Sequence, residues 1–139
     1  MSSRRISAKD KALVAKRANF CCEYCVSQSR YFGPFSIEHV RPLSKGGSNQ
    51  LSNLALACQH CNNFKYSKIE DIDPSSGSLA PLYNPRQQNW TDHFAWNEDY
   101  SKIVGLTATG RATVSSLRLN RAELIAARKA FYKLKEHPP

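Results

Sequence analysis

Two short segments, Cys22-Glu23-Tyr24-Cys25 and Cys58-Gln59-His60-Cys61, decide how this chain folds. Each is a Cys-x2-Cys pair, and two such pairs can supply the four thiolates of a tetrahedral zinc site. With zinc bound, the segment between the pairs would start and end at one point. We therefore expect Zn²⁺ as a structural cofactor on Cys22, Cys25, Cys58 and Cys61, with no position left open for chemistry.

A fifth cysteine, Cys21, makes the cysteine count odd. Cys21 is the extra thiol if Cys22 is a ligand, although a Cys21-x3-Cys25 pair is also sterically possible. The polar, basic start of the chain has no apolar segment typical of a secretory signal, and no apolar run reaches membrane-spanning length. We expect a cytoplasmic protein with no membrane partner, in which paired cysteines bind metal more often than they form disulfides.

The composition is that of a small globular protein with a basic surface. Its 139 residues suffice for one domain with a modest core, and 41% are hydrophobic against 22% charged. The 20 Lys and Arg residues exceed the 11 Asp and Glu residues, which gives a formal net charge of +9. This balance favours an anionic partner, most often a nucleic acid, although charge alone is weak support.

Between and beside the cysteine pairs, the sequence predicts two strands and a helix. Phe35 to Val40 and Leu54 to Cys58 are short apolar runs, and the loop between them is rich in Pro, Ser, Gly and Asn. A helix is expected from Cys61 to about Ile69. Before this ββα unit, a capping box at Ser7 to Asp10 predicts a helix to about Asn19.

After the ββα unit, Pro74 to Pro85 is expected to be a connector. Asp92 to Trp96 and Lys102 to Leu106 are predicted strands, and a capping box at Asn120 to Glu123 predicts a helix to about Leu134. Neither half has much to bury alone. We therefore expect one α+β domain over residues 1–139, with a core motif at 22–69 and a C-terminal α/β extension at 84–136.

The segment from Cys22 to Lys65 resembles the HNH endonucleases, whose fold is the ββα-metal (His-Me) finger. The resemblance lies in the two Cys-x2-Cys pairs, Glu38-His39 with Pro42 nearby, Gly46-Gly47, Asn53-Leu54 and Cys61-Asn62-x2-Lys65. It is closest to the zinc-stapled subgroup that has Asn at the third motif position.

The resemblance implies a role for each motif residue. His39 would be the general base that activates water, and Asn53 would assist catalysis by fixing the loop. Glu38 and Asn62 would hold one catalytic divalent cation, Mg²⁺, Mn²⁺ or another, because hard cations take oxygen ligands. Asn62 could instead only cap the helix. Asn53 could also cap a turn, which is compatible with its catalytic role.

Four residues are candidates for contacts with nucleic acid: Lys65, Arg41, His93 and Arg111. Lys65 follows Asn62 by one helical turn, which suits contact with a backbone phosphate. His93 is ambiguous, since it could approach the phosphate or the metal site, or simply lie on a strand. Isolated arginines such as Arg111 are usually surface charge.

Taken together, the sequence and the resemblance predict a metal-dependent endonuclease that nicks or cuts DNA, and the resemblance implies 5′ phosphate and 3′ hydroxyl ends. One ββα unit cuts one strand, so a double-strand break needs two successive nicks or a homodimer; for nicking, a monomer suffices. The alternative is a non-catalytic, zinc-containing nucleic-acid-binding module. That reading is motivated by Asn62 in place of histidine and by Glu38 in place of the usual aspartate. A zinc-stabilised protein-interaction domain fits the basic charge less well.

Overall fold

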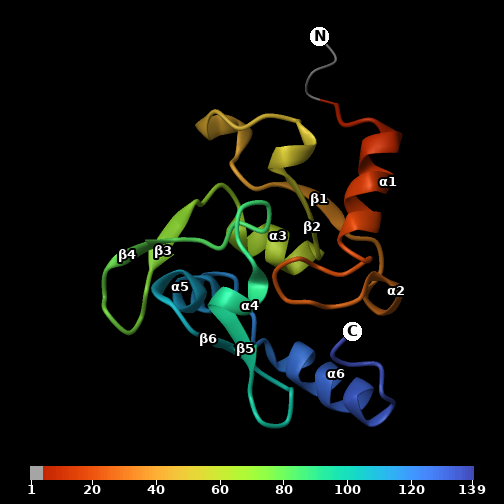
Figure 1. Cartoon of the computed structure of the whole chain (residues 1–139), viewed down its shortest axis with the longest axis vertical. Helices are drawn as coiled ribbons and strands as arrows, with labels where there is room; N and C mark the ends of the chain where they lie inside the picture. Colours follow the sequence, from red (N-terminus) through yellow and green to blue (C-terminus); the bar gives the residue numbers. More distant parts are fainter. Residues whose placement is uncertain (1–4) are drawn as a thin grey trace. The chain divides into compact units, whose positions relative to one another are not determined.

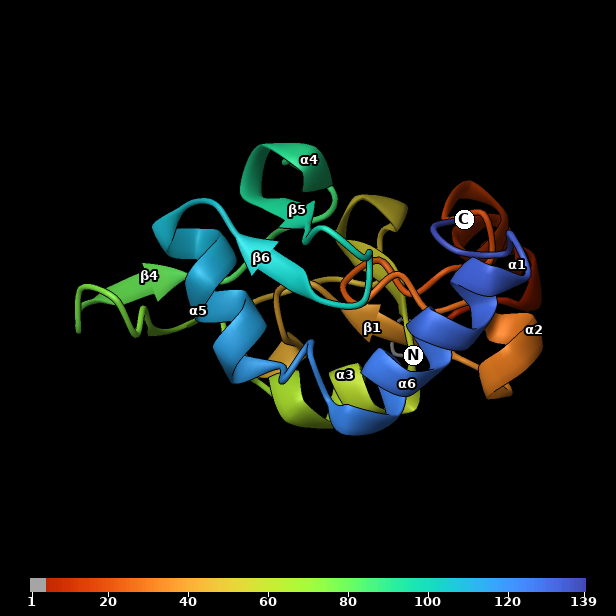
Figure 2. The same cartoon turned by 90° about the horizontal axis from the view of Figure 1, so that it is seen from below.

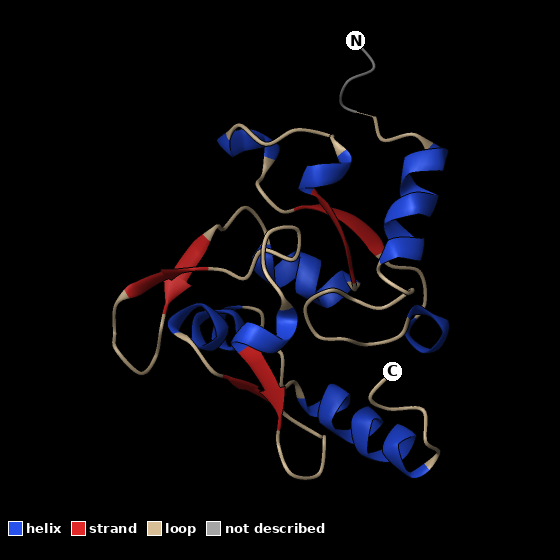
Figure 3. Ribbon diagram, in the orientation of Figure 1, coloured by secondary structure: helices blue, strands red, loops and turns tan. Residues whose placement is uncertain are grey.

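A computed structural model describes residues 5–139, which form two compact units (Figure 1). The first unit comprises the chain up to residue 69 together with residues 84–87, and the second comprises residues 70–83 and 88–139. Helices and short antiparallel strands make up both units, which confirms the α+β class (Figure 3). Within residues 5–139, no helix is long and apolar enough to span a bilayer. The polar start that we expected at residues 1–4 lies outside the described residues.

The expected ββα unit forms the centre of the first unit. Strand β1 (Ser36–His39) pairs antiparallel with β2 (Leu54–Ala57), and α3 (Gln59–Lys65) follows β2 directly. In this register His39 lies opposite Leu54, at the end of the hairpin that the loop of residues 40–53 connects. Helix α3 ends earlier than expected, because Tyr66 has a positive φ of 51° that an α-helix cannot contain.

Helix α1 (Ala8–Arg17) packs against β2, and its Val14 is buried there. The Ser7 hydroxyl accepts a hydrogen bond from the Asp10 N–H at 3.1 Å, which is the N-cap that the sequence predicts. Three short helices complete the unit: α2 (Ser29–Phe32), η2 (Leu43–Lys45) and η3 (Leu51–Asn53). Buried Val14, Leu54 and Leu56 form the core, with partly buried Ile6, Ala15, Ala18, Phe35, Ile37 and Leu51 around them.

The second unit contains two hairpins and three helices. Strands β3 (Glu70–Ile72) and β4 (Leu79–Pro81) form one hairpin, and β5 (Phe94–Trp96) and β6 (Ile103–Gly105) form the other. The helices are α4 (Trp90–His93), α5 (Ala108–Ser116) and α6 (Ala122–Lys133). Helix α5 packs on β6 and also contacts β3 and β4, so it joins the two hairpins (Figure 2).

Three expectations for this region are wrong. The connector expected from Pro74 to Pro85 contains β4, and the strand expected from Asp92 begins only at Phe94 because α4 precedes it. The second capping box does not form. Instead, the Asn120 amide bonds to the backbone of Ile103, accepting from its N–H at 2.7 Å and donating to its carbonyl at 2.9 Å.

Candidate functional site

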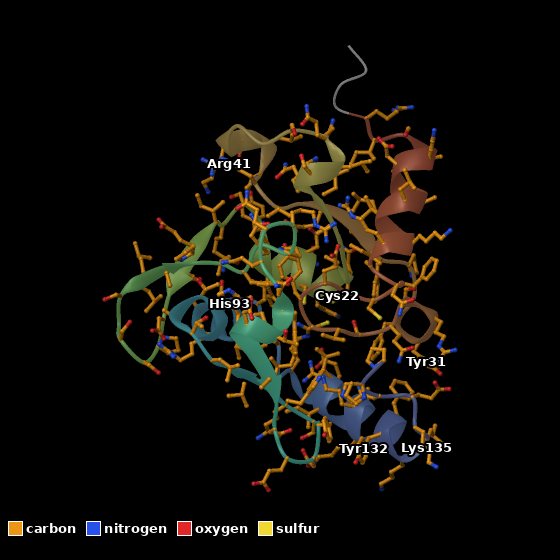
Figure 4. All side chains as sticks on the ribbon, viewed as in Figure 1. Cys22, Tyr31, Arg41, His93, Tyr132 and Lys135 are labelled. Carbon is orange, nitrogen blue, oxygen red and sulfur yellow. The ribbon has the colours of Figure 1, made fainter. Side chains whose placement is uncertain are left out.

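The four predicted zinc ligands come together in the first unit. Their Sγ atoms all lie within 4.8 Å of one another, and all four side chains are buried. One pair lies in the turn that precedes α2, and the other lies where β2 passes into α3; Cys22 is labelled in Figure 4. The cluster thus joins the turn of residues 22–25, which we call the first knuckle, to the ββα unit, as the Cys-x2-Cys spacing predicts.

The donor set fits zinc. A tetrahedral site with Zn–S bonds of about 2.3 Å has sulfur–sulfur separations of about 3.8 Å, and the Sγ atoms of Cys25 and Cys58 are 3.7 Å apart. The N–H groups of Cys25 and Cys61 point at the sulfurs of Cys22 and Cys58, at 3.5 and 3.4 Å. Hydrogen bonds from the other three cysteines, that from Cys22 foremost, lower the pKa of the Cys58 thiol, which favours the thiolate that binds metal.

Cys21 lies outside this cluster. Its thiol is 3.4 Å from the carbonyl oxygen of Asn19, and its backbone forms an isolated β-bridge with Gln28. Cys22, rather than Cys21, therefore joins the tetracysteine group. Burial raises the pKa of the Cys21 thiol, as expected of an inert, protonated cysteine.

His39 stands at the end of β1 with one ring nitrogen held in place. Its Nε2 is 2.7 Å from the amide oxygen of Asn49. An amide oxygen only accepts hydrogen bonds, so this contact assigns the proton to Nε2 and leaves the lone pair on Nδ1. The ring is half-buried. The arrangement is that of an oriented base.

Asn53 ties together the two ends of the loop that follows His39. Its Oδ1 accepts from the Arg41 N–H at 2.8 Å, and its Nδ2 donates to the carbonyls of Arg41 and Ser48 at 3.0 and 2.8 Å. Gly47 makes this closure possible, since a Cβ there would lie 1.8 Å from the Arg41 carbonyl oxygen. These bonds match the loop-fixing role expected of Asn53, and they also hold the segment that carries Asn49.

Glu38 does not face solvent as a cation ligand should. Its side chain is 3% exposed, and both carboxylate oxygens are engaged: Oε2 with the Lys65 ammonium at 2.6 Å and Oε1 with the Tyr24 hydroxyl at 2.6 Å. Burial raises the pKa of Glu38, while Lys65 and Tyr24 act in the opposite direction. This geometry does not fit the expected metal-binding role, because both oxygens are already used inside the protein.

The position of Lys65 likewise does not fit the role expected for it. Its side chain is 1% exposed, and its Nζ donates to Glu38, to the His39 carbonyl at 3.2 Å and to the Val40 carbonyl at 2.9 Å. All three N–H donors of the ammonium are therefore used. Contact with a backbone phosphate does not fit this position; Lys65 instead fixes the end of β1 that carries His39.

The other two predicted residues of the first unit are accessible. Asn62 is half-buried on α3, directly after Cys61, and its side chain forms no hydrogen bond with any residue of the described part of the chain. Its amide oxygen therefore stays a candidate ligand. Arg41 is exposed, and its Nε donates to the Lys45 carbonyl at 2.8 Å, which leaves the outer edge of its guanidinium toward solvent (Figure 4).

The segment 84–87 belongs to the first unit through Arg86. Its guanidinium forms an ion pair with Oε1 of Glu23, and Oε2 of Glu23 accepts from the Leu56 N–H at 2.9 Å. The Glu23 N–H in turn donates to the Leu56 carbonyl at 2.9 Å. Glu23 thus connects the first knuckle to β2 and to a segment far along the chain.

The remaining two predicted residues lie in the second unit. Arg111 forms a bidentate ion pair with buried Asp73, at 2.9 Å for both contacts, so the expected phosphate contact does not fit it. Its hydrogen bonds lower the pKa of Asp73 far below the ordinary value. His93 is labelled in Figure 4; its Nδ1 lies 2.7 Å from the Thr107 hydroxyl. The centroid of its ring is 6.0 Å from that of the Tyr83 ring.

Sequence reasoning missed two residues of the site, Tyr24 and Asn49. Tyr24 lies inside the first Cys-x2-Cys pair and is fully buried, and its contact with Glu38, fourteen residues along the chain, leaves no local signal in the sequence. Asn49 follows the Gly-Gly pair in a polar loop. Its only sequence signal is an amide between the two motif elements His39 and Asn53, which many loops would also show.

Comparison with known proteins agrees with this geometry. Residues 22–68 match the model of the HNH endonuclease family, described as "HNH endonuclease". The match spans the tetracysteine cluster, the hairpin with His39 and the helix with Asn62. Neither the curated proteins nor the solved structures gave a match to the chain.

Proposed function

We propose that the HNH domain at residues 22–68 is a metal-dependent endonuclease that hydrolyses phosphodiester bonds in DNA. The observation that carries the proposal is His39, whose Nε2 lies 2.7 Å from the Asn49 amide oxygen, a contact that assigns the ring proton to Nε2 and the lone pair to Nδ1. The family match supports a nuclease or nucleic-acid-binding role for the same segment. The net charge of +9 suits a polyanionic substrate.

In the proposed reaction, Nδ1 of His39 takes a proton from the water that attacks the phosphorus. A neutral imidazole can do this near pH 7, and the oxygen of Asn49 stabilises the imidazolium that forms. The loop closed by Asn53 keeps Asn49 in position, and Lys65 keeps the β1 end in position. The leaving 3′ oxygen receives the electron pair of the broken P–O bond and takes a proton from solvent water, which gives a 5′ phosphate and a 3′ hydroxyl.

A divalent cation, Mg²⁺ or Mn²⁺, would supply the positive charge that the leaving oxygen needs. Asn62 is the protein ligand that we retain for it, while Glu38 is engaged with Lys65. Zinc on the four cysteines would be structural, because a closed four-thiolate site has no open position. His93 is retained as a candidate nucleic-acid contact of the second unit.

The test is a nicking assay on supercoiled plasmid with the zinc-loaded protein and added Mg²⁺, Mn²⁺ or Ni²⁺. The wild-type protein should nick only with added cation, and His39→Ala should lose nicking while it keeps its circular dichroism spectrum and zinc content. His60→Ala is the matched control, because His60 is an exposed histidine on α3. Equal nicking by wild type and His39→Ala would reject His39 as the base.

One observation favours a second candidate, a non-catalytic nucleic-acid-binding module. Glu38 is withdrawn into an ion pair, which leaves Asn62 as the one predicted cation ligand that faces outward. Salt-dependent DNA binding without cleavage, under every cation, would support this module against the nuclease.

A further inference from the structure

We infer that Tyr66, an aromatic residue at a strained and exposed turn, stacks on a nucleobase of the DNA substrate. The inference rests on the proposed function and names a contact that the HNH motif does not include. Tyr66 follows directly after Lys65, whose ammonium binds the carbonyl of His39. A base stacked on Tyr66 would therefore be bound at the helix end that also holds the general base.

Exposure is the first observation. The Tyr66 side chain is 82% exposed, the highest value among the exposed large hydrophobic residues of the described chain. Its side chain forms no hydrogen bond or ring contact with any residue between positions 5 and 139. A single exposed aromatic side chain is not unusual by itself, so exposure needs a second observation.

The second observation is the backbone of the turn. Residues 65–68 form a β-turn closed by the Lys68 N–H and the Lys65 carbonyl at 2.9 Å, and Tyr66 has φ 51° and ψ −120°. Those are the angles of the first central residue of a type II′ turn, a position that strongly favours glycine. Such strained conformations persist where the surrounding structure holds them, and they cluster at functional sites.

The third observation is the setting of the turn. Lys65 is locked by three hydrogen bonds on one side of Tyr66, and the ammonium of Lys45 binds the Ser67 carbonyl on the other. The ring is therefore presented from a fixed base. Exposed Lys45 and Arg41, linked through the Lys45 carbonyl, place positive charge in the same loop.

An exposed aromatic ring beside cations is the arrangement with which proteins bind unpaired nucleotides, since bases stack on the ring while cations meet the phosphates. Buried ion pairing of Lys65 removes one candidate phosphate contact, but Lys45 and Arg41 remain. The partner that fits this surface is thus a DNA strand with at least one unstacked base, as found in single-stranded or gapped DNA.

The test compares binding of a fluorescent single-stranded oligonucleotide by His39→Ala protein, without added divalent cation, and by the same protein carrying Tyr66→Gly or Tyr66→Phe. Tyr66→Gly should weaken binding by about five- to a hundred-fold, the range for loss of one stacked base. Tyr66→Phe should bind like the parent. The salt dependence of binding should not change, because no charge is lost.

A purely structural Tyr66 predicts a different pattern. If Tyr66 only shaped the turn, Tyr66→Gly would change stability and leave affinity unchanged. Because glycine suits the turn, stacking instead predicts that Tyr66→Gly raises the melting temperature while it lowers affinity. Leu43→Ala, at another exposed apolar residue of the Lys45 loop, is the control and should bind like the parent. Unchanged affinity in Tyr66→Gly overturns the inference alone, whereas a parent protein with no affinity for DNA at low salt overturns the proposed function as well.

Discussion

Removing the Lys65 ammonium tests whether Glu38 belongs to the interior of the protein or to a metal site. In Lys65→Met, the carboxylate of Glu38 would stay buried without its cation. At 2.6 Å and an effective dielectric constant of about 20, the lost attraction is about 6 kcal/mol. The protein has a less costly response, which is to protonate Glu38.

The cost of protonating Glu38 sets the upper limit of the stability that Lys65→Met loses with the ion pair. This cost is about 1.4 kcal/mol for each pH unit above the ordinary glutamate pKa of about 4.3, or about 3.7 kcal/mol at pH 7. The Lys65 variant also leaves the carbonyls of His39 and Val40 without a donor. Comparison with the double variant Glu38→Gln/Lys65→Met cancels the cost of these two carbonyls, because both variants lack the ammonium. Glutamine has the shape of a protonated glutamate, so the two variants differ only in the charge at position 38.

The sign of the pH dependence follows from the pKa of Glu38, which burial raises even with Lys65 present. In Lys65→Met, the folded protein retains a proton that the unfolded chain releases above about pH 4.3. Its free energy of unfolding must therefore fall as the pH rises. Relative to the double variant, we expect a deficit of about 2 kcal/mol at pH 6 and about 3–4 kcal/mol at pH 7.

The assay is urea unfolding of the zinc-loaded variants, followed by far-ultraviolet circular dichroism at each pH. A deficit below about 1 kcal/mol that does not change with pH would refute the buried ion pair. In that case the Glu38 carboxylate reaches solvent without difficulty. Stabilisation of Lys65→Met by Mg²⁺ would then mark Glu38 as a cation ligand after all.

Three further outcomes are expected. Chelation of zinc, or Cys58→Ser, should remove circular dichroism signal of the first unit while the emission of the tryptophans changes less, because both tryptophans lie in the second unit. Asp73→Asn should lower the melting temperature at pH 7, and the difference from wild type should shrink as the pH falls below about 4. At that pH the Asp73 carboxylate of the unfolded chain takes up a proton, whereas in the folded protein, where Arg111 lowers its pKa, it stays ionised to lower pH. Gly47→Ala should abolish nicking by displacing the Arg41 carbonyl, whereas Gly46→Ala, at φ 85° with open space around it, should cost only about 1 kcal/mol of stability and keep the activity, as plasmid nicking and thermal melts would show.

The ββα unit could be predicted because its signals are local and mutually consistent. Cysteine spacing predicts the cluster, two short apolar runs predict β1 and β2, and a serine N-cap predicts the start of α1. The same reasoning failed where one side chain had two possible partners. Asn120 could cap α6 or bond to the backbone of β6. Tertiary packing brings it to Ile103 of β6, and the local sequence does not show this.

The site was predicted in part for a similar reason. The side chains of His39 and Asn53 bond to residues of the loop between them, so a local motif suffices to place them. The motif does not suffice to place Lys65. A lysine one turn along a helix ordinarily lies on the surface, and lysine is rarely buried without a partner. Its burial depends on Glu38 and Tyr24, which a linear sequence does not show as neighbours. Likewise, the spacing of Ser, Gly and Pro between residues 74 and 78 indicates a loop but not the β3–β4 hairpin around it.

The return of residues 84–87 to the first unit has a consequence for the modularity of the chain. The polypeptide passes between the two units three times, after residues 69, 83 and 87. A fragment that stops at the end of the family match would lose Arg86 and leave the largely buried carboxylate of Glu23 without its cation. The segment that carries the HNH motif therefore cannot be removed or transferred as one continuous piece without the loss of this ion pair. Any transfer of the HNH segment to another scaffold must carry the Arg86 segment with it.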